Sequence, residues 1–417
     1  MVDIAVSCLV LTAVLAYLNH RFVGLPTTIG VMGIAMALSF LPVGLEKLGV
    51  GNMREYEQVL LSSIDFSGIL MQGMLSLLLF AGALQVDLDE LRNVRWQVGS
   101  LAVLGTLFSS ILIGFGLWYI LPIVSIFLPL SYCLVFGTLI SPTDPIAVLG
   151  ILKSARVPKR LELLIAGESL FNDGVGVVLF SLAAAAACGE VPTIQHTLAL
   201  LFQEAGGGIL LGLALGYLCF VMLRSIDSYL EEVLITLATV LGGYELATHI
   251  HVSGPLAMVV AGLVIGNHGR ALAMSPETRH RLDMFWEMLD GMLNAVLFVL
   301  LGLQVTQIAL STGILVAAAA VVVITLAARL ISVAAPMRMF SHTFALPSGS
   351  WKVLTWGGLR GGISVALALS LRAGPERDLI LALTYSVVVF SILGQGLSIG
   401  YVARKALAPK HSEDSPA

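Results

Sequence analysis

The chain has 417 residues, of which 58% are hydrophobic and only 12% charged, and its net charge is −4. A soluble globular domain holds roughly 25% charged residues, so this composition cannot cover a surface that faces water. No basic run indicates a nucleic-acid partner. The composition therefore predicts an all-α polytopic membrane protein.

A helix needs about 20 mostly apolar residues to cross the hydrocarbon core of a bilayer. Apolar stretches of about this length recur along the whole chain and predict about thirteen spans. Their approximate limits are 3–20, 25–43, 59–86, 97–120, 126–152, 160–187, 196–223, 229–249, 254–267, 284–306, 309–335, 352–372 and 378–403. The connecting loops are short, so no separate extramembrane domain is expected.

Basic residues are distributed unevenly between alternate loops. The even-numbered loops hold only Lys47, Arg54, Arg372 and Arg377, whereas most other Lys and Arg residues fall in odd-numbered loops and the C-terminal tail. Short cytoplasmic loops are enriched in Lys and Arg. We therefore expect an integral protein of the cell (inner) membrane, with its N-terminus outside and its C-terminus in the cytoplasm.

Two arginines, Arg329 and Arg360, lie inside predicted spans. A charged side chain at mid-bilayer costs at least about 2.5–3.5 kcal/mol, so each arginine must face protein or water and have a partner.

The fifth predicted span is interrupted by Ser141-Pro142-Thr143-Asp144-Pro145. The two prolines lack backbone donors and release carbonyl groups of the preceding turn. Broken backbone at membrane depth is tolerated where it is buried in protein or lines a hydrated cavity. The freed carbonyls, together with Thr143 and Asp144, are groups that can bind a small cation. A simple proline kink is the alternative, which the aspartate between the prolines disfavours.

The sixth predicted span carries Glu168, Ser169, Asn172 and Asp173 within six residues. Ser169 and Asp173 are four residues apart and share a helix face, while Glu168 and Asn172 share the adjoining face. One interpretation is that these polar side chains only form hydrogen bonds with one another in the interior of the helix bundle. Within so apolar a span, they indicate an ion or proton site.

The twelfth predicted span is interrupted near residues 356–364 by the glycine-rich run WGGLRGGIS. Paired interruptions in two halves of a chain are typical of inverted-repeat transporters, whose substrate sites lie at the interrupted helices. The two interrupted spans should run in opposite directions and cross near the midplane. We expect Arg360 to offset negative charge at this crossing and Arg329 to pair with Glu168.

The motifs SPTDP, GESLFNDG, AARLISV and GLRGGISVALAL resemble the NhaP-type cation/proton antiporters, relatives of the sodium/proton exchangers. The resemblance implies an NhaA-like antiporter fold of thirteen helices and a homodimer. It assigns residues 1–95 and 189–307 to a dimerisation part, residues 96–188 and 308–404 to a core with two broken crossing helices, and residues 405–417 to a short cytoplasmic tail.

The same resemblance implies that Asp173 alternately binds a cation and a proton. It implies that Ser169 and Thr143 are Na+ ligands, that Asp144 lies close by, and that Asn172 supports an ion pair between Glu168 and Arg329. Asn172 before the aspartate is similar to the electroneutral branch of the family. One position departs from many relatives, which have a glutamate where this chain has Ala81.

The function expected is exchange of a monovalent cation, Na+ with Li+ as a further candidate, for H+ by alternating access, with no cofactor and no enzymatic activity. Ion and proton would compete for Asp173, because burial away from water favours the protonated form of a carboxyl group. K+/H+ exchange is the alternative within transport. An intramembrane aspartyl hydrolase using Asp144 and Asp173 is the alternative from another class. Asp290 and Asn294, which share a face of the tenth span, are interpreted as polar contacts between helices.

Overall fold

The computed structural model describes residues 2–47, 73–155, 157–189, 199, 202–270, 273–307, 312–339, 346–347 and 349–407. These residues form helices and connecting segments, and their β-type pairing is confined to one isolated bridge between Asp144 and Leu359. The start of the third predicted span and the tail beyond residue 407 lie outside the described residues.

The helices in the first half of the chain are α1 (Val2–Leu18), η1 (Asn19–Val23), α2 (Thr27–Lys47), α5 (Leu75–Leu84), α6 (Leu88–Arg92), α7 (Arg95–Gly99), η3 (Ser100–Gly105), α8 (Thr106–Ile120), η4 (Leu121–Val124), α9 (Leu130–Ile140), α10 (Ile146–Ser154) and α11 (Lys159–Ala187). Those in the second half are η5 (Phe202–Gly206), α13 (Gly207–Arg224), α14 (Tyr229–His249), α15 (Gly254–Val264), η6 (Ile265–Gly269), α17 (Pro276–Leu303), η7 (Gln304–Gln307), α18 (Thr312–Met339), α20 (Ser350–Trp356), α21 (Gly362–Leu369), α22 (Pro375–Val389), η8 (Phe390–Gly396) and α23 (Leu397–Leu407).

Seven helical stretches of the described residues are long and apolar enough to cross a membrane, and shorter apolar helices accompany them. Their outward faces are apolar: on α13, for example, Leu210 is 69% and Tyr217 65% exposed. Water would make such faces costly, whereas lipid solvates them. The chain is therefore an integral membrane protein. The total of about thirteen spans stays a prediction.

Local sequence explains where several helices begin and end. The Ser253 and Ser275 hydroxyls accept from backbone N–H groups at the starts of α15 and α17, and a proline follows each serine in the first turn. By contrast, α9 ends at Ile140, just before Pro142, and α20 ends at Trp356, before two glycines. The helix interruptions thus fall at the residues that disfavour continued helix.

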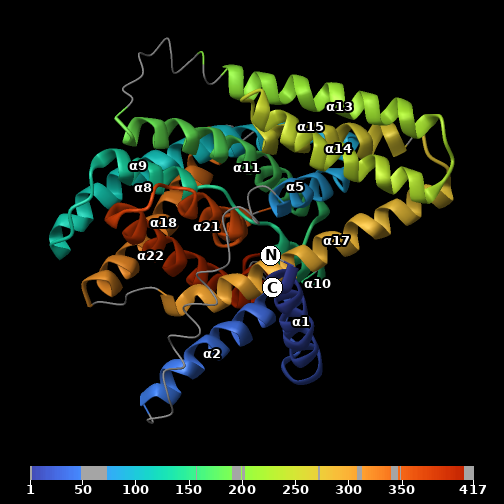
Figure 1. Ribbon diagram of the computed structural model, residues 1–417. Helices are drawn as coiled ribbons and strands as arrows, with labels where there is room; N and C mark the ends of the chain where they lie inside the picture. Colours follow the sequence, from blue (N-terminus) through green and yellow to red (C-terminus); the bar gives the residue numbers. More distant parts are fainter. Residues whose placement is uncertain are drawn as a thin grey trace, which may run out of the picture.

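Two groups of helices lie in different parts of the fold (Figure 1). Each group packs around an apolar cluster of its own. Helices α5, α13, α14, α15 and α17 share a cluster that contains Phe80, Met258 and Trp286. Helices α8, α9, α18, α21 and α22 share a second cluster that contains Phe136 and Val321. Helix α11 contacts both α9 and α15, so it lies between the two groups.

Candidate cation and proton site

The first helix interruption joins α9 to α10 through residues 141–145. Pro142 and Pro145 contribute no backbone donors there. The Ser141 hydroxyl donates to the Gly137 carbonyl at 2.7 Å and accepts from the Ser110 hydroxyl at 3.0 Å, which ties the end of α9 to α8. Ser141, Pro142 and Thr143 are all buried in protein, one of the two settings in which broken backbone is tolerated within a membrane.

The second interruption, between α20 and α21, lies directly against the first. The backbone N–H of Asp144 donates to the Leu359 carbonyl at 2.8 Å, which forms the antiparallel bridge between the two breaks. Gly361 is required at this contact, because a Cβ there would lie 2.3 Å from Oδ2 of Asp144. Segments more than 200 residues apart in sequence therefore meet at one point.

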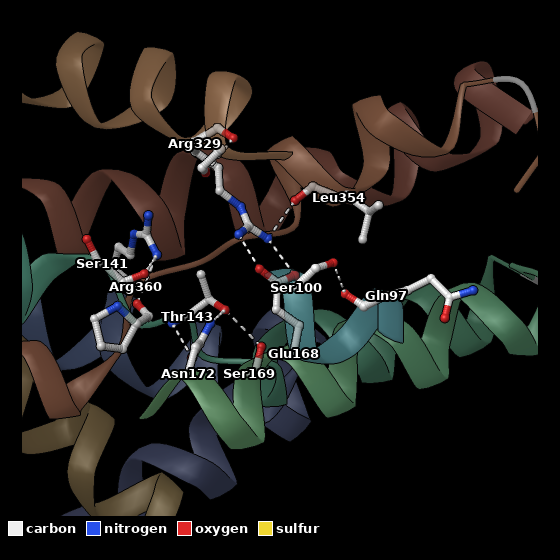
Figure 2. Close-up of polar contacts among 12 residues, drawn as sticks. Gln97, Ser100, Ser141, Thr143, Glu168, Ser169, Asn172, Arg329, Leu354 and Arg360 are labelled. Atoms are coloured by element: carbon white, nitrogen blue, oxygen red, sulfur yellow. Dashed lines mark hydrogen bonds and ion pairs between the residues drawn. The ribbon is translucent and has the colours of Figure 1, made fainter. Parts of the chain in front are cut away.

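Arg360 joins the two breaks with its side chain (Figure 2). Its Nη1 donates to the Ser141 carbonyl and, at 2.9 Å, to the Pro142 carbonyl, groups that the end of α9 leaves without helical partners. Its backbone N–H donates to the Ser391 hydroxyl at 2.8 Å. The guanidinium is 2% exposed and offsets the negative carbonyl end of α9.

Helix α11 presents Ser169, Asn172 and Asp173 to the first break. The hydroxyls of Thr143 and Ser169 lie 2.9 Å apart. The Asn172 amide donates to the Thr143 hydroxyl at 2.8 Å, and its oxygen accepts from the Thr143 backbone N–H at 3.2 Å. The close approach depends on Gly176, where a Cβ would lie 2.1 Å from Cγ of Pro142.

Asp173 lies one turn beyond Ser169 on α11 and is 7% exposed. Among the described residues, none donates a hydrogen bond to its carboxylate, and the charged group that acts on it is Asp144. A buried carboxyl without protein donors must be satisfied by a proton, a cation or water. The Asp173 carboxylate is therefore the group at the break that is available to bind a proton or a cation.

Glu168, on the adjoining face of α11, is buried and forms an ion pair with Arg329 of α18. Nη1 of Arg329 bonds Oε1 of Glu168, and Nη2 donates to Oε2 at 2.9 Å and to the Leu354 carbonyl at 3.1 Å (Figure 2). Such two-pronged geometry satisfies both carboxylate oxygens and ties α11, α18 and α20 together.

One expectation about this pair is wrong in detail. Asn172 was expected to support the ion pair, but its hydrogen bonds run to Thr143. The physical reason is that the break leaves the Thr143 backbone N–H without a helical acceptor, and an amide side chain can satisfy both that N–H and the neighbouring hydroxyl. Asn172 therefore holds the broken segment against α11.

Comparison with known proteins decides the family. Residues 10–405 match the model of the transmembrane sodium/hydrogen exchanger family. The chain belongs to this family. It is 50% identical to the Na(+)/H(+) antiporter NhaP of Pseudomonas aeruginosa, over 100% of this chain and 99% of that protein. It is 36% identical to the Na(+)/H(+) antiporter NhaH of Halobacillus dabanensis, over 89% and 91% of the two chains.

The fold is similar to that of the sodium proton antiporter MjNhaP1 from Methanocaldococcus jannaschii. The TM-score is 0.69 at 20% identity, and the match covers 91% of this chain and 99% of that one. The NhaP antiporter fold is thus shown for this sodium/hydrogen exchanger, whereas the roles of individual residues rest on the geometry described above.

Sequence reasoning missed the position of Asp290 in this exchanger. Asp290 and Asn294 were interpreted as contacts between helices, but the Asn294 amide donates within α17, to Oδ1 of Asp290 at 3.0 Å. Asp290 is half-buried and lies close enough to Asp144 for their charges to interact. The motif around the break gave no signal for a third acidic group, because α17 comes from a distant part of the sequence.

Ala81, the position for which the family resemblance led us to expect a glutamate in many relatives, is buried in α5 and shares an apolar cluster with Phe80 and Leu84. Its methyl side chain supplies no oxygen ligand, so the acidic and hydroxyl groups described near the break come from α11, residues 141–145 and Asp290 of α17.

Proposed function

We propose that this protein exchanges Na+ for H+ across the membrane by alternating access, and that the two ions compete for Asp173. Family membership supports sodium/proton antiport. The observation that carries the site is the buried Asp173 carboxylate, which lacks donors among the described residues and lies beside a broken helix. The transported ions are its ligands, and no cofactor is needed.

In this proposal, Na+ is held by the Asp173 carboxylate, the Ser169 hydroxyl and the Thr143 backbone, with Asp144 nearby. The hydrogen bonds among Thr143, Ser169 and Asn172 support it, because they gather oxygen atoms from two elements next to the carboxylate. Hydroxyl, carbonyl and carboxylate oxygens suit a hard cation. Arg360 and the Glu168–Arg329 pair keep the surrounding charge and backbone in place.

The architecture proposed has thirteen spans in inverted repeats, with the breaks at 141–145 and 356–364 crossing near the midplane. Residues 96–188 and 308–404 form the core, and residues 1–95 and 189–307 form the dimerisation part of a homodimer. Two apolar clusters support this division, because one contains residues of the proposed dimerisation part and the other residues of the proposed core. A third cluster packs the two parts against each other. The N-terminus is outside and the C-terminus cytoplasmic, as the distribution of Lys and Arg indicates.

The direct test is transport in vesicles that contain the purified protein. Asp173→Asn should abolish Na+-driven proton movement, because an amide can neither release a proton nor carry negative charge to the cation. The matched control is Glu162→Gln, which removes a carboxyl from the first turn of the same helix and should leave exchange unchanged. Exchange by Asp173→Asn at the wild-type rate would refute the assignment. Parallel assays with Li+ and K+ define which cations compete.

A further inference from the structure

Two neighbouring helices, α20 and α23, each carry an exposed basic side chain over an aromatic ring. On α20, Nζ of Lys352 lies 5.5 Å from the ring centre of Trp351. On α23, Nζ of Lys405 lies 5.7 Å from the ring centre of Tyr401. All four residues are exposed. Each pair therefore presents a cation and an aromatic face at one point of the surface.

Helix α20 packs antiparallel to α23, which places the two pairs at one junction. A Cβ on Gly349, the residue just before α20, would lie 2.1 Å from the Ala406 carbonyl oxygen, so the start of α20 touches the end of α23. At the other end of α20, Nε1 of Trp356 donates to the Ser398 hydroxyl at 2.8 Å. The first turn of α20 therefore lies beside the last turns of α23, which carry residues 401–405.

One face of α23 changes along its length from apolar to cationic. Leu397, Tyr401 and Lys405 follow one another at intervals of four residues and so share a face of the helix. Leu397 is 50% and Tyr401 61% exposed, and the exposed Arg404 lies beside Lys405 at the cationic end. The opposite face is buried, at Ile399 for example. This order of apolar, aromatic and cationic groups matches the acyl chain, interfacial region and headgroup of a phospholipid.

The charge of this surface is unbalanced. Neither α20 nor α23 contains an Asp or Glu residue. Lys352, Arg404 and Lys405 take part in none of the ion pairs that the described residues form. Basic residues at a membrane surface attract anionic lipids, each strengthening the attraction about fivefold. The surface therefore favours a negatively charged ligand.

The apolar part of the surface favours a lipid over other anions. Free phosphate would leave Leu397 and Tyr401 uncovered. Residues 408–417, which follow α23, include two acidic residues, but their sequence APKHSEDSPA has no large apolar side chain. A phospholipid supplies both a phosphate and acyl chains. The predicted span 378–403 ends between Tyr401 and Arg404, where lipid headgroups are expected.

We propose that this surface of α20 and α23 binds one anionic phospholipid. Lys352, Arg404 and Lys405 hold its phosphate, and an acyl chain lies along Leu397 and Tyr401. The bound lipid joins the start of α20 to the end of α23, and so supports the helix that leads into the second break.

The test is titration of the purified, delipidated full-length protein in detergent with phosphatidylglycerol, followed by native mass spectrometry and by melting temperature. One phosphatidylglycerol per chain should bind with saturation and raise the melting temperature, because a ligand of the folded state stabilises it. Phosphatidylcholine of equal chain length has no net charge and should bind at least about tenfold more weakly. Glycerol phosphate, which has no acyl chain, should have no effect at the same concentration.

Variants locate the site. Lys352→Gln and Lys405→Gln should each weaken phosphatidylglycerol binding about fivefold, because each removes one cation from the headgroup. Lys405→Arg keeps the charge and should bind the lipid as the wild type does. The matched control is Arg224→Gln, which removes an exposed arginine from the last turn of α13 and should leave binding unchanged. All the replaced side chains are exposed, so the variants should fold normally.

Equal affinity for phosphatidylglycerol and phosphatidylcholine would overturn the proposal, because the basic residues would then hold no headgroup. Wild-type affinity in the Lys352→Gln/Lys405→Gln double variant would also overturn it, because the lipid would then lie elsewhere. Binding that appears only after residues 408–417 are removed would assign the surface to the tail instead. Asp173→Asn should retain phosphatidylglycerol binding, so failure of the cation site and failure of the lipid site are distinguishable.

Discussion

At the scale of single residues, the site separates two kinds of buried charge. Glu168 has two bonds from Arg329 and is fully satisfied, whereas Asp173, five residues later, receives none from the described residues. A satisfied ion pair holds structure, and an unsatisfied carboxyl can exchange ligands. The sequence placed both acids on one helix, and their different partners depend on which face meets α18 and which meets the first break.

The ion pair gives a prediction about stability. Arg329→Ala should lower the free energy of unfolding by about 3–5 kcal/mol, because it leaves Glu168 buried without a partner. The change is measured as a lower melting temperature and a lower yield of folded protein in detergent. Arg338→Ala, which removes an exposed arginine from the same helix, should have little effect. An Arg329→Ala protein as stable as wild type would show that the ion pair does not contribute to the stability of the fold.

At the scale of elements, the two helix breaks act as one unit. Prolines predicted the first break and glycines the second, because these residues disfavour helix wherever they lie. The contacts between the breaks could not be predicted in the same way. That Arg360 reaches the carbonyls of Ser141 and Pro142, and that Asp290 of α17 lies near Asp144, depends on how distant helices pack.

The contact between the breaks predicts the effect of Gly361→Ala. Its Cβ would lie 2.3 Å from Oδ2 and 2.7 Å from Cβ of Asp144, so the Asp144 side chain and the bridge beside it must shift. Exchange should therefore fall at least about tenfold through misplacement of the site. Gly150→Ala on α10 is the control, because its Cβ would enter open space. Rates of Na+-driven proton movement in vesicles compare the two. Normal exchange by Gly361→Ala would mean that the bridge opens without cost to transport.

At the scale of the whole molecule, the composition and the apolar stretches predicted an all-helical membrane protein, and the fold confirms this coarse expectation. Helices lie at the predicted spans wherever the structure describes them, since hydrophobic length is set by the bilayer and is local in sequence. Division into a core and a dimerisation part came from family resemblance. It stays a prediction, which crosslinking of purified protein in membranes can test.

Electroneutral exchange is a prediction about the whole transport cycle. With one Na+ exchanged for one H+, no net charge crosses the membrane, so an imposed potential should not change the rate. Movement of one net charge would instead couple to the potential by about 2.3 kcal/mol per 100 mV. The measurement is exchange in vesicles with and without a potassium diffusion potential at fixed pH. A rate that follows the potential would contradict one-for-one exchange.

The most direct test of the central claim is the apparent KM for Na+ as a function of pH, measured on both sides of the optimum with purified protein in vesicles. If Na+ and H+ compete for Asp173, protons displace Na+ as the pH falls. The apparent KM should then rise by up to about tenfold per pH unit on the acidic side, while the maximal rate at saturating Na+ is retained. An apparent KM that stays constant while the maximal rate falls with pH would contradict competition at a single carboxylate.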